Sequence, residues 1–133
     1  MPHAWPALVT LAALLFYAVT IANVGRARDR YNIKAPSVTG HPDFERVHRV
    51  QENTLEQLAL FLPALWLCAM FFSPVWGSLL GAIWIFGRIV YAIGYTRAAN
   101  KRGLGFVITF FAFAALWICS AWGVLRMLLA SEP

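Results

Sequence analysis

The stretch ERVHRVQENTLEQLALFLPALW, residues 45–66, begins with closely spaced charges and ends as an apolar run. Arg49, Asn53 and Glu56 therefore stand where a helix is about to enter lipid. A carboxylate in that position costs several kcal/mol unless it is paired or lines a polar cavity. We therefore expect a membrane helix with a polar site at one end.

Composition extends this expectation to the whole chain. Its 133 residues are 60% hydrophobic and only 13% charged, with a mean hydropathy of +0.63. Four apolar stretches, about 5–24, 54–72, 75–95 and 105–125, each approach the ~20 residues that cross ~30 Å of hydrocarbon as a helix. The sequence predicts an all-α integral membrane protein, an up-down four-helix transmembrane bundle in a single domain (1–133), with spans of about 5–30, 43–72, 75–102 and 105–129.

The basic residues indicate a topology. They gather between the first and second spans and between the third and fourth, whereas the second and third are joined by only Ser73 and Pro74. The positive-inside rule then makes both basic loops cytoplasmic and puts both termini on the other side. The first span lacks a basic n-region, so we expect it to be retained and not cleaved as a signal peptide. The membrane is either the bacterial inner membrane or the endoplasmic reticulum. The charge pattern does not favour nucleic-acid binding.

The interruptions in the apolar pattern predict three local features. The third span is expected to continue through RAANKR, residues 97–102, until Gly103 and Gly105 stop it. Pro63 is expected to kink the second span. Cys68 and Cys119 fall inside spans, as packing residues or, alternatively, redox-active ones. The three histidines have no metal-site spacing, so no metal is expected.

Polar residues form one stripe on each of two predicted helices. At about 100° per residue, Arg49, Asn53 and Glu56 share one sector of the second helix. The third helix carries a matching stripe at the same end of the membrane: Arg88, Tyr91, Tyr95 and Arg102. Arginines bind carboxylates, a glutamate binds an ammonium, and Gln51, Asn53 and the tyrosines bind amides. This inventory suits a small zwitterionic peptide with surplus carboxylate. Glutathione fits it, although not uniquely.

Other interpretations of the stripes remain open at this point. The charges could neutralise one another within or between helices and bind no ligand, in a set made of Arg49, Glu52, Glu56 and Arg88. The charges near Arg49 could also be ordinary solvated residues at a helix end. Tyr91 and Tyr95 could be aromatic residues of the membrane interface. A proton-coupled multidrug exporter also has four short spans, but the first span here lacks the acidic residue that such a protein needs.

Two segments carry a resemblance to a known family. PSVTGHPDFERVHRVQENTLEQLALFLPALW (36–66) and GRIVYAIGYTRAANKRGLGF (87–106) resemble the membrane-associated proteins in eicosanoid and glutathione metabolism, the MAPEG family. The similarity is greatest to microsomal glutathione transferases of types 2 and 3 and to leukotriene-C synthase. It implies a homotrimer of four-helix subunits that binds glutathione between neighbouring subunits near the cytoplasmic side.

The resemblance also assigns roles by position. Arg49, Asn53, Glu56, Tyr91 and Tyr95 match positions that contact glutathione. Arg28 and Gln51 match contacts made from the adjacent subunit, Arg88 matches a buried arginine, and Arg102 matches the catalytic arginine that faces the glutathione sulfur. Two positions depart from the synthase pattern: Gln57 replaces a tyrosine, and Asp29 replaces the second residue of a basic pair.

The function that the resemblance implies is a glutathione transferase for detoxification. It would add an activated glutathione thiolate to a lipophilic electrophile in the membrane, or reduce a lipid hydroperoxide as a glutathione peroxidase. The alternative is a non-catalytic lipid-binding scaffold of the same family, which would lack glutathione affinity.

Overall fold

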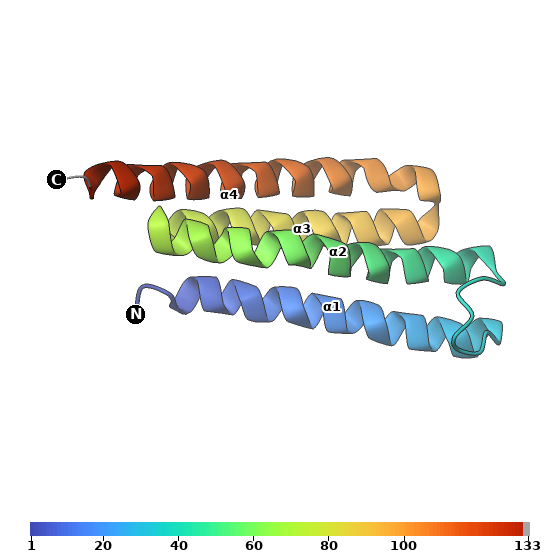
Figure 1. Ribbon diagram of the computed structural model, residues 1–133. Helices are drawn as coiled ribbons and strands as arrows, with labels where there is room; N and C mark the ends of the chain where they lie inside the picture. Colours follow the sequence, from blue (N-terminus) through green and yellow to red (C-terminus); the bar gives the residue numbers. More distant parts are fainter. Residues whose placement is uncertain (132–133) are drawn as a thin grey trace.

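The computed structural model describes residues 1–131 as four long helices and one short 3₁₀ helix (Figure 1). The α-helices are α1 (Ala4–Tyr31), α2 (Pro42–Phe71), α3 (Pro74–Arg97) and α4 (Gly103–Ala130), and η1 (Ala99–Arg102) joins the last two. All four are long and apolar enough to cross a membrane. The expected all-helical fold is confirmed, and its four long apolar helices fit the four expected membrane spans.

Local sequence signals begin and end these helices. The His41 side chain accepts a hydrogen bond from the Asp43 backbone N–H at the start of α2, and Ser73 accepts one from Trp76 at the start of α3. Each of these helices has a proline in its first turn, where no intrahelical donor is needed. Asn32 ends α1 in the left-handed conformation, with φ 54°. The α2 helix continues through Pro63 to Phe71.

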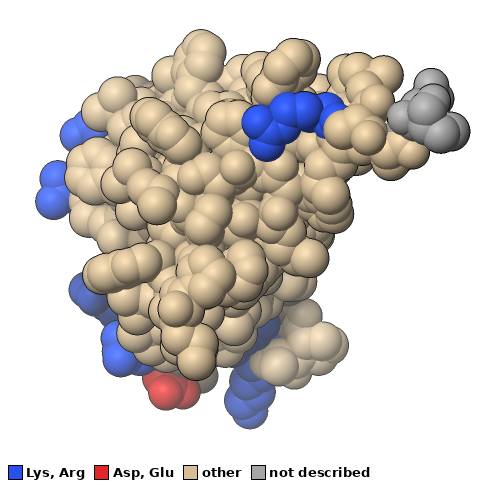
Figure 2. Space-filling model, turned by 90° about the vertical axis from the view of Figure 1, so that its left-hand side faces the viewer, with Lys and Arg blue, Asp and Glu red and all other residues tan. Residues whose placement is uncertain are grey.

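The helices alternate in direction, with α1 and α4 on opposite sides of the α2–α3 pair (Figure 1). The α1–α2 loop and η1 lie together at one end, which we call the basic end, and the chain termini lie at the other. Seen from the end with the termini, the surface is almost entirely uncharged, and most blue side chains project only at its margin (Figure 2). The polar groups of the second and third spans therefore share one end of the bundle.

A compact core joins the helices near mid-bundle. The rings of Phe61 and Trp84 stack with centroids 3.9 Å apart, and Leu65 and Leu116 pack around them, all fully buried. Most other large apolar side chains point outward, as expected of a protein whose solvent is hydrocarbon. On α1 only a narrow stripe of mainly small residues is buried: Pro6, Val9, Ala13, Thr20, Val24 and Ala27.

The end of the third span differs from the expectation. The α3 helix stops at Arg97, because Ala98 is extended (φ −161°, ψ 140°), and residues 99–102 turn back as η1. Gly103 starts α4, and Gly105 lies inside it, so neither glycine stops a helix. The turn is possible because Gly94 has no side chain: a Cβ there would lie 2.2 Å from the Lys101 carbonyl oxygen. Gly94 serves a tertiary contact that sequence pattern alone does not reveal.

Candidate functional site

The charged residues of the α2 stripe lie on the outside of the bundle. One guanidinium nitrogen of Arg49 lies 3.4 Å from a carboxylate oxygen of Glu52 and 3.4 Å from one of Glu56. The Arg49 and Glu56 side chains are 47% and 57% exposed. Exposed ion pairs of this kind contribute little to stability, about 0–1 kcal/mol. These charges are therefore free to exchange their partners for those of a ligand.

Arg88 on α3 is a buried cation, only 1% exposed. Its Nη1 donates to Asn53 Oδ1 and its Nη2 to Thr54 Oγ1, both at 2.8 Å. Its guanidinium lies 4.3 Å from the ring centre of Tyr91, and within residues 1–131 its Nε has no hydrogen-bond partner. The alternative of mutual neutralisation therefore holds for Arg49 with Glu52 and Glu56. It does not hold for Arg88, since in the described residues no carboxylate lies within 4.0 Å of this arginine.

Tyr91 and Tyr95 stack one turn apart on α3, with ring centroids 5.6 Å apart. Both are largely buried and pack against Val50 of α2. A close approach of α4 fixes the position of Tyr91: a Cβ on Gly105 would lie 2.2 Å from the Tyr91 backbone nitrogen. The two tyrosines are therefore held between helices.

Arg102 reaches the same site by a different route from the one expected. It is the last residue of η1 and not part of α3, yet its guanidinium lies 5.6 Å from the Tyr95 ring centre. The fold-back at Gly94 replaces the helical spacing that we expected to align the two residues. The side chain itself is exposed, as a group that must approach a ligand would be.

Arg28 and Gln51 lie elsewhere in the subunit. The Arg28 guanidinium donates to the Ser37 carbonyl oxygen at 2.7 Å and lies over the Phe44 ring at 5.1 Å, so it holds the α1–α2 loop. Gln51 faces α1, where its amide donates to the Tyr17 hydroxyl at 3.2 Å. Within one chain, the predicted residues thus separate into an α2–α3 strip and two outliers. The strip consists of Arg49, Asn53, Glu56, Arg88, Tyr91, Tyr95 and Arg102.

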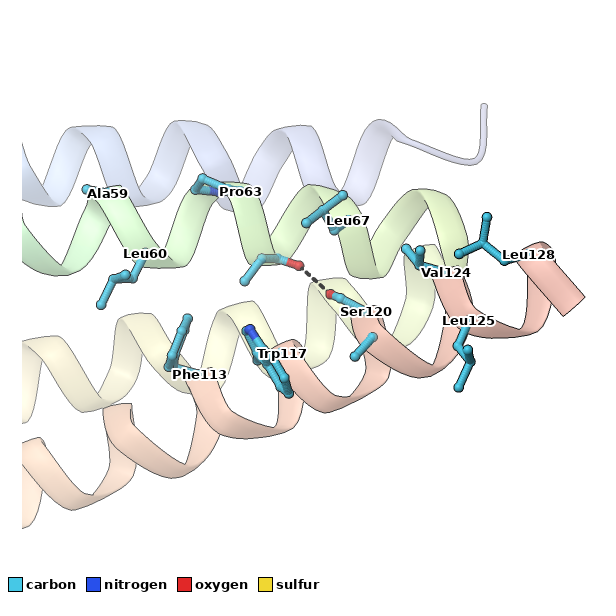
Figure 3. A pocket seen from close by; sticks show the side chains of 12 residues that line it. Ala59, Leu60, Pro63, Leu67, Phe113, Trp117, Ser120, Val124, Leu125 and Leu128 are labelled. Atoms are coloured by element: carbon cyan, nitrogen blue, oxygen red, sulfur yellow. Dashed lines mark hydrogen bonds between the residues drawn. The ribbon is translucent and has the colours of Figure 1, made fainter.

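An apolar groove continues the strip toward the other end of the bundle. It lies between α2 and α4, encloses about 600 Å³ and is floored near Ser120, whose hydroxyl bonds the Ala64 carbonyl at 3.1 Å (Figure 3). Leu60 and Pro63, which line it, follow Glu56 at spacings of four and seven on α2, so they share its face. Trp117 lines the groove with 60% of its surface exposed. A polar strip and an apolar groove therefore adjoin along one helix.

Sequence reasoning missed two polar partners. Thr54 is fully buried and accepts from Arg88, while its hydroxyl donates to the Val50 carbonyl at 2.7 Å. Tyr17 is a polar residue in an otherwise apolar span and meets Gln51. For Tyr17, the available signal was a hydroxyl in an apolar stretch; Thr54 stands in the mostly polar stretch 51–56, where one more hydroxyl gives no such signal. Cys68 and Cys119 are free and belong to the core cluster, as packing residues do.

Comparison with known proteins identifies the family of this chain. The model of the MAPEG family matches residues 6–122. An uncharacterized protein of Synechocystis sp. is 56% identical, over 78% of this chain and 76% of its own length. Microsomal glutathione S-transferase 2 of Bos taurus is 40% identical, over 80% of this chain and 73% of its own length. Leukotriene C4 synthase of Cavia porcellus is 37% identical, over 92% and 79% respectively.

Proposed function

Because the chain belongs to the MAPEG family, we propose that it is a membrane-bound glutathione transferase. Glutathione would bind as cosubstrate along the α2–α3 strip, and its sulfur would attack a lipophilic electrophile dissolved in the bilayer. The product is a thioether. With a lipid hydroperoxide as the electrophile, the thiolate sulfur would attack the terminal oxygen and break the O–O bond, which releases the lipid alcohol and leaves glutathione sulfenic acid. A second glutathione would then displace water from that sulfenic acid and form glutathione disulfide.

The observation that carries this proposal is the uncompensated cation at the centre of the strip. Burying a charge without a carboxylate partner costs several kcal/mol, and Arg88 has only neutral partners in the described chain. An anionic ligand beside Asn53 and Tyr91 would lower that cost. Arg49 would then bind a glutathione carboxylate with its two-nitrogen fork, and Glu56 would bind the ammonium.

Arg102 would activate the sulfur. The thiolate is the nucleophilic form, and an unperturbed thiol has a pKa of about 8.5, so little of it is ionised at neutral pH. A fixed guanidinium against the sulfur favours the anion, and each unit by which the thiol pKa falls corresponds to about 1.4 kcal/mol. The thiol proton passes to solvent, which is accessible at the exposed end of η1.

The α2–α4 groove supplies a place for the second substrate. It is apolar, it opens to the outside of the subunit, and it begins one helical turn beyond Glu56. A lipophilic molecule lying there would present its reactive carbon to a sulfur held at the strip. This arrangement brings a polar thiol and an apolar electrophile together at one membrane depth, and their proximity favours the reaction.

The outlying positions of Arg28 and Gln51 suit a homotrimer. In one chain they face away from the strip, while the strip itself lies on an outer face. A neighbouring subunit would cover that face and bring its own Arg28 and Gln51 to the ligand. The basic end would face the cytoplasm, as the positive-inside rule predicts.

A matched pair of variants tests the role of Arg102. We expect Arg102→Ala to lose thiolate absorbance and conjugation of a halonitroarene at neutral pH while glutathione still binds. Lys101→Ala, which removes the same charge from the adjacent exposed residue, should behave as the parent protein. Equal activity of the two variants would refute the assignment. A parent protein with no measurable glutathione affinity would instead support the scaffold alternative.

A further inference from the structure

A second polar hollow lies at the basic end, away from the α2–α3 strip. It encloses about 480 Å³ between α1, α2 and α3, and its lining includes four arginines: Arg26, Arg30, Arg46 and Arg97. Among the residues that the structure describes, Asp43 is the one carboxylate in the lining. Arginine is the side chain best suited to phosphate, because its planar fork matches two phosphate oxygens.

The single carboxylate already has partners. Asp43 forms an ion pair with Arg46 and accepts a hydrogen bond from the Tyr31 hydroxyl at 3.2 Å. Arg46 is further held by the Thr96 carbonyl oxygen, so its role is to join α2 to α3. Among the residues that the structure describes, Arg26, Arg30 and Arg97 have no carboxylate within 4.0 Å. Three of the four arginines that line the hollow thus have no carboxylate partner in the described residues.

This hollow is separate from the proposed glutathione site. Arg26 and Arg30, four residues apart, share one face of α1 with Asn23 and Ala27. Arg28, between them, turns to the α1–α2 loop, where it bonds Ser37. None of the seven residues of the α2–α3 strip lines the hollow.

An apolar seam leads from the hollow into the membrane. A smaller space of about 130 Å³ between α1, α2 and α3 shares Asn23, Val47 and Thr96 with the hollow and is lined farther in by Val19 and Ile93. Farther along the same two helices, a groove of about 640 Å³ is lined almost entirely by apolar residues, including Leu8, Ala12 and Leu79. The arginines therefore stand beside the first of two apolar spaces that follow one another along the α1–α3 seam.

We propose that this surface binds one anionic phospholipid. The headgroup phosphate would lie among Arg26, Arg30 and Arg97, and an acyl chain would follow the α1–α3 seam. Basic pockets between transmembrane helices at the membrane surface are suited to anionic headgroups. A free phosphate would use the arginines but not the seam, and a zwitterionic lipid would bring no net charge to them. Because the arginine-lined hollow adjoins the apolar seam, we favour an anionic lipid as the ligand.

The test uses the purified full-length protein in mild detergent, titrated with phosphatidylglycerol and followed by native mass spectrometry. We expect one lipid per chain at saturation. The R26Q/R30Q/R97Q variant should bind on the order of a hundredfold more weakly, since each arginine near an anionic headgroup contributes roughly fivefold. The matched variant K34Q/K101Q/R126Q removes the same charge outside the hollow and should bind as the parent does.

Further arms distinguish the source of the phosphate. Val19→Trp fills the seam but leaves the arginines in place, and we expect it to weaken phosphatidylglycerol binding without affecting glutathione conjugation. Phosphatidylcholine, glycerol phosphate and inorganic phosphate should not compete. Equal loss in the two triple variants, equal binding of phosphatidylcholine, or displacement by inorganic phosphate would each overturn the proposal. Val19→Trp decides the matter if the triple variant does not fold.

Discussion

The hydrogen bond from Arg88 to Thr54 makes a quantitative prediction about stability. Thr54→Val keeps the shape of the side chain but removes the hydroxyl that accepts from Arg88 Nη2 at 2.8 Å. Thr54 is fully buried and Arg88 is 1% exposed, so water cannot replace the lost partner. A hydrogen bond to a charged group contributes about 1.5–3 kcal/mol, and we expect the free energy of unfolding to fall by that amount.

The chain offers a matched control. Thr109 is also buried in a membrane helix, but its hydroxyl bonds only the Gly105 and Phe106 carbonyls of its own helix. Those carbonyls keep their helical partners, so Thr109→Val should change stability by less than about 0.5 kcal/mol. Unfolding in mixed micelles, followed by circular dichroism at increasing denaturing detergent, measures both variants. Equal losses would refute the special role of the Arg88 contact.

A double-mutant cycle isolates the contact itself. In an Arg88→Met background the donor that needs the Thr54 hydroxyl is gone, so Thr54→Val should then cost no more than Thr109→Val does. The coupling energy between positions 54 and 88 should equal most of the single-variant loss, as for residues in direct contact. A coupling energy near zero would mean that Thr54 stabilises the protein through packing alone.

Two further predictions test the surroundings of the strip. Gly105→Ala places a Cβ 2.2 Å from the Tyr91 backbone nitrogen, so α4 must shift. We expect the free energy of unfolding to fall by about 1–3 kcal/mol and glutathione to bind more weakly, as measured by unfolding and calorimetry. Gly103→Ala, where a Cβ would meet open space, should change neither quantity. Trp117→Ala removes an exposed ring from the α2–α4 groove. We expect the KM for a lipophilic electrophile to rise severalfold, while glutathione affinity and stability stay unchanged. An unaltered KM would mean that this substrate binds elsewhere.

The helices could be predicted from sequence because each signal is local. Apolar runs, a proline at the first turn and a capping serine fix α2 and α3 to within a residue or two at three of their four ends. The fourth end, at Arg97, depends on the contact of Gly94 with Lys101, and a glycine that admits a neighbouring carbonyl looks the same in sequence as one that ends a helix. Local pattern carries no information about that neighbour.

The candidate site shows the same division. Periodicity placed Arg49, Asn53 and Glu56 on one face of α2, because the spacing of residues within a helix is fixed. It did not identify the partners of Arg88, since those depend on how α3 is rotated against α2. The structure turns Arg88 toward Thr54 and Asn53 and leaves Glu56 outside with Arg49. Arg28 and Gln51 lie away from the strip for the same reason.

The fold-back between α3 and α4 limits how this segment can evolve. Most surface connections tolerate insertions, because their length affects only the entropy of closing the loop. Here Arg102 meets Tyr95 through a turn in which the Lys101 carbonyl sits against Gly94. We expect one residue added or lost in that turn to move the guanidinium away from the Tyr95 ring. If Arg102 activates the sulfur as proposed, a homologue that has altered the spacing from tyrosine to arginine should lose the activity, however similar its apolar spans remain.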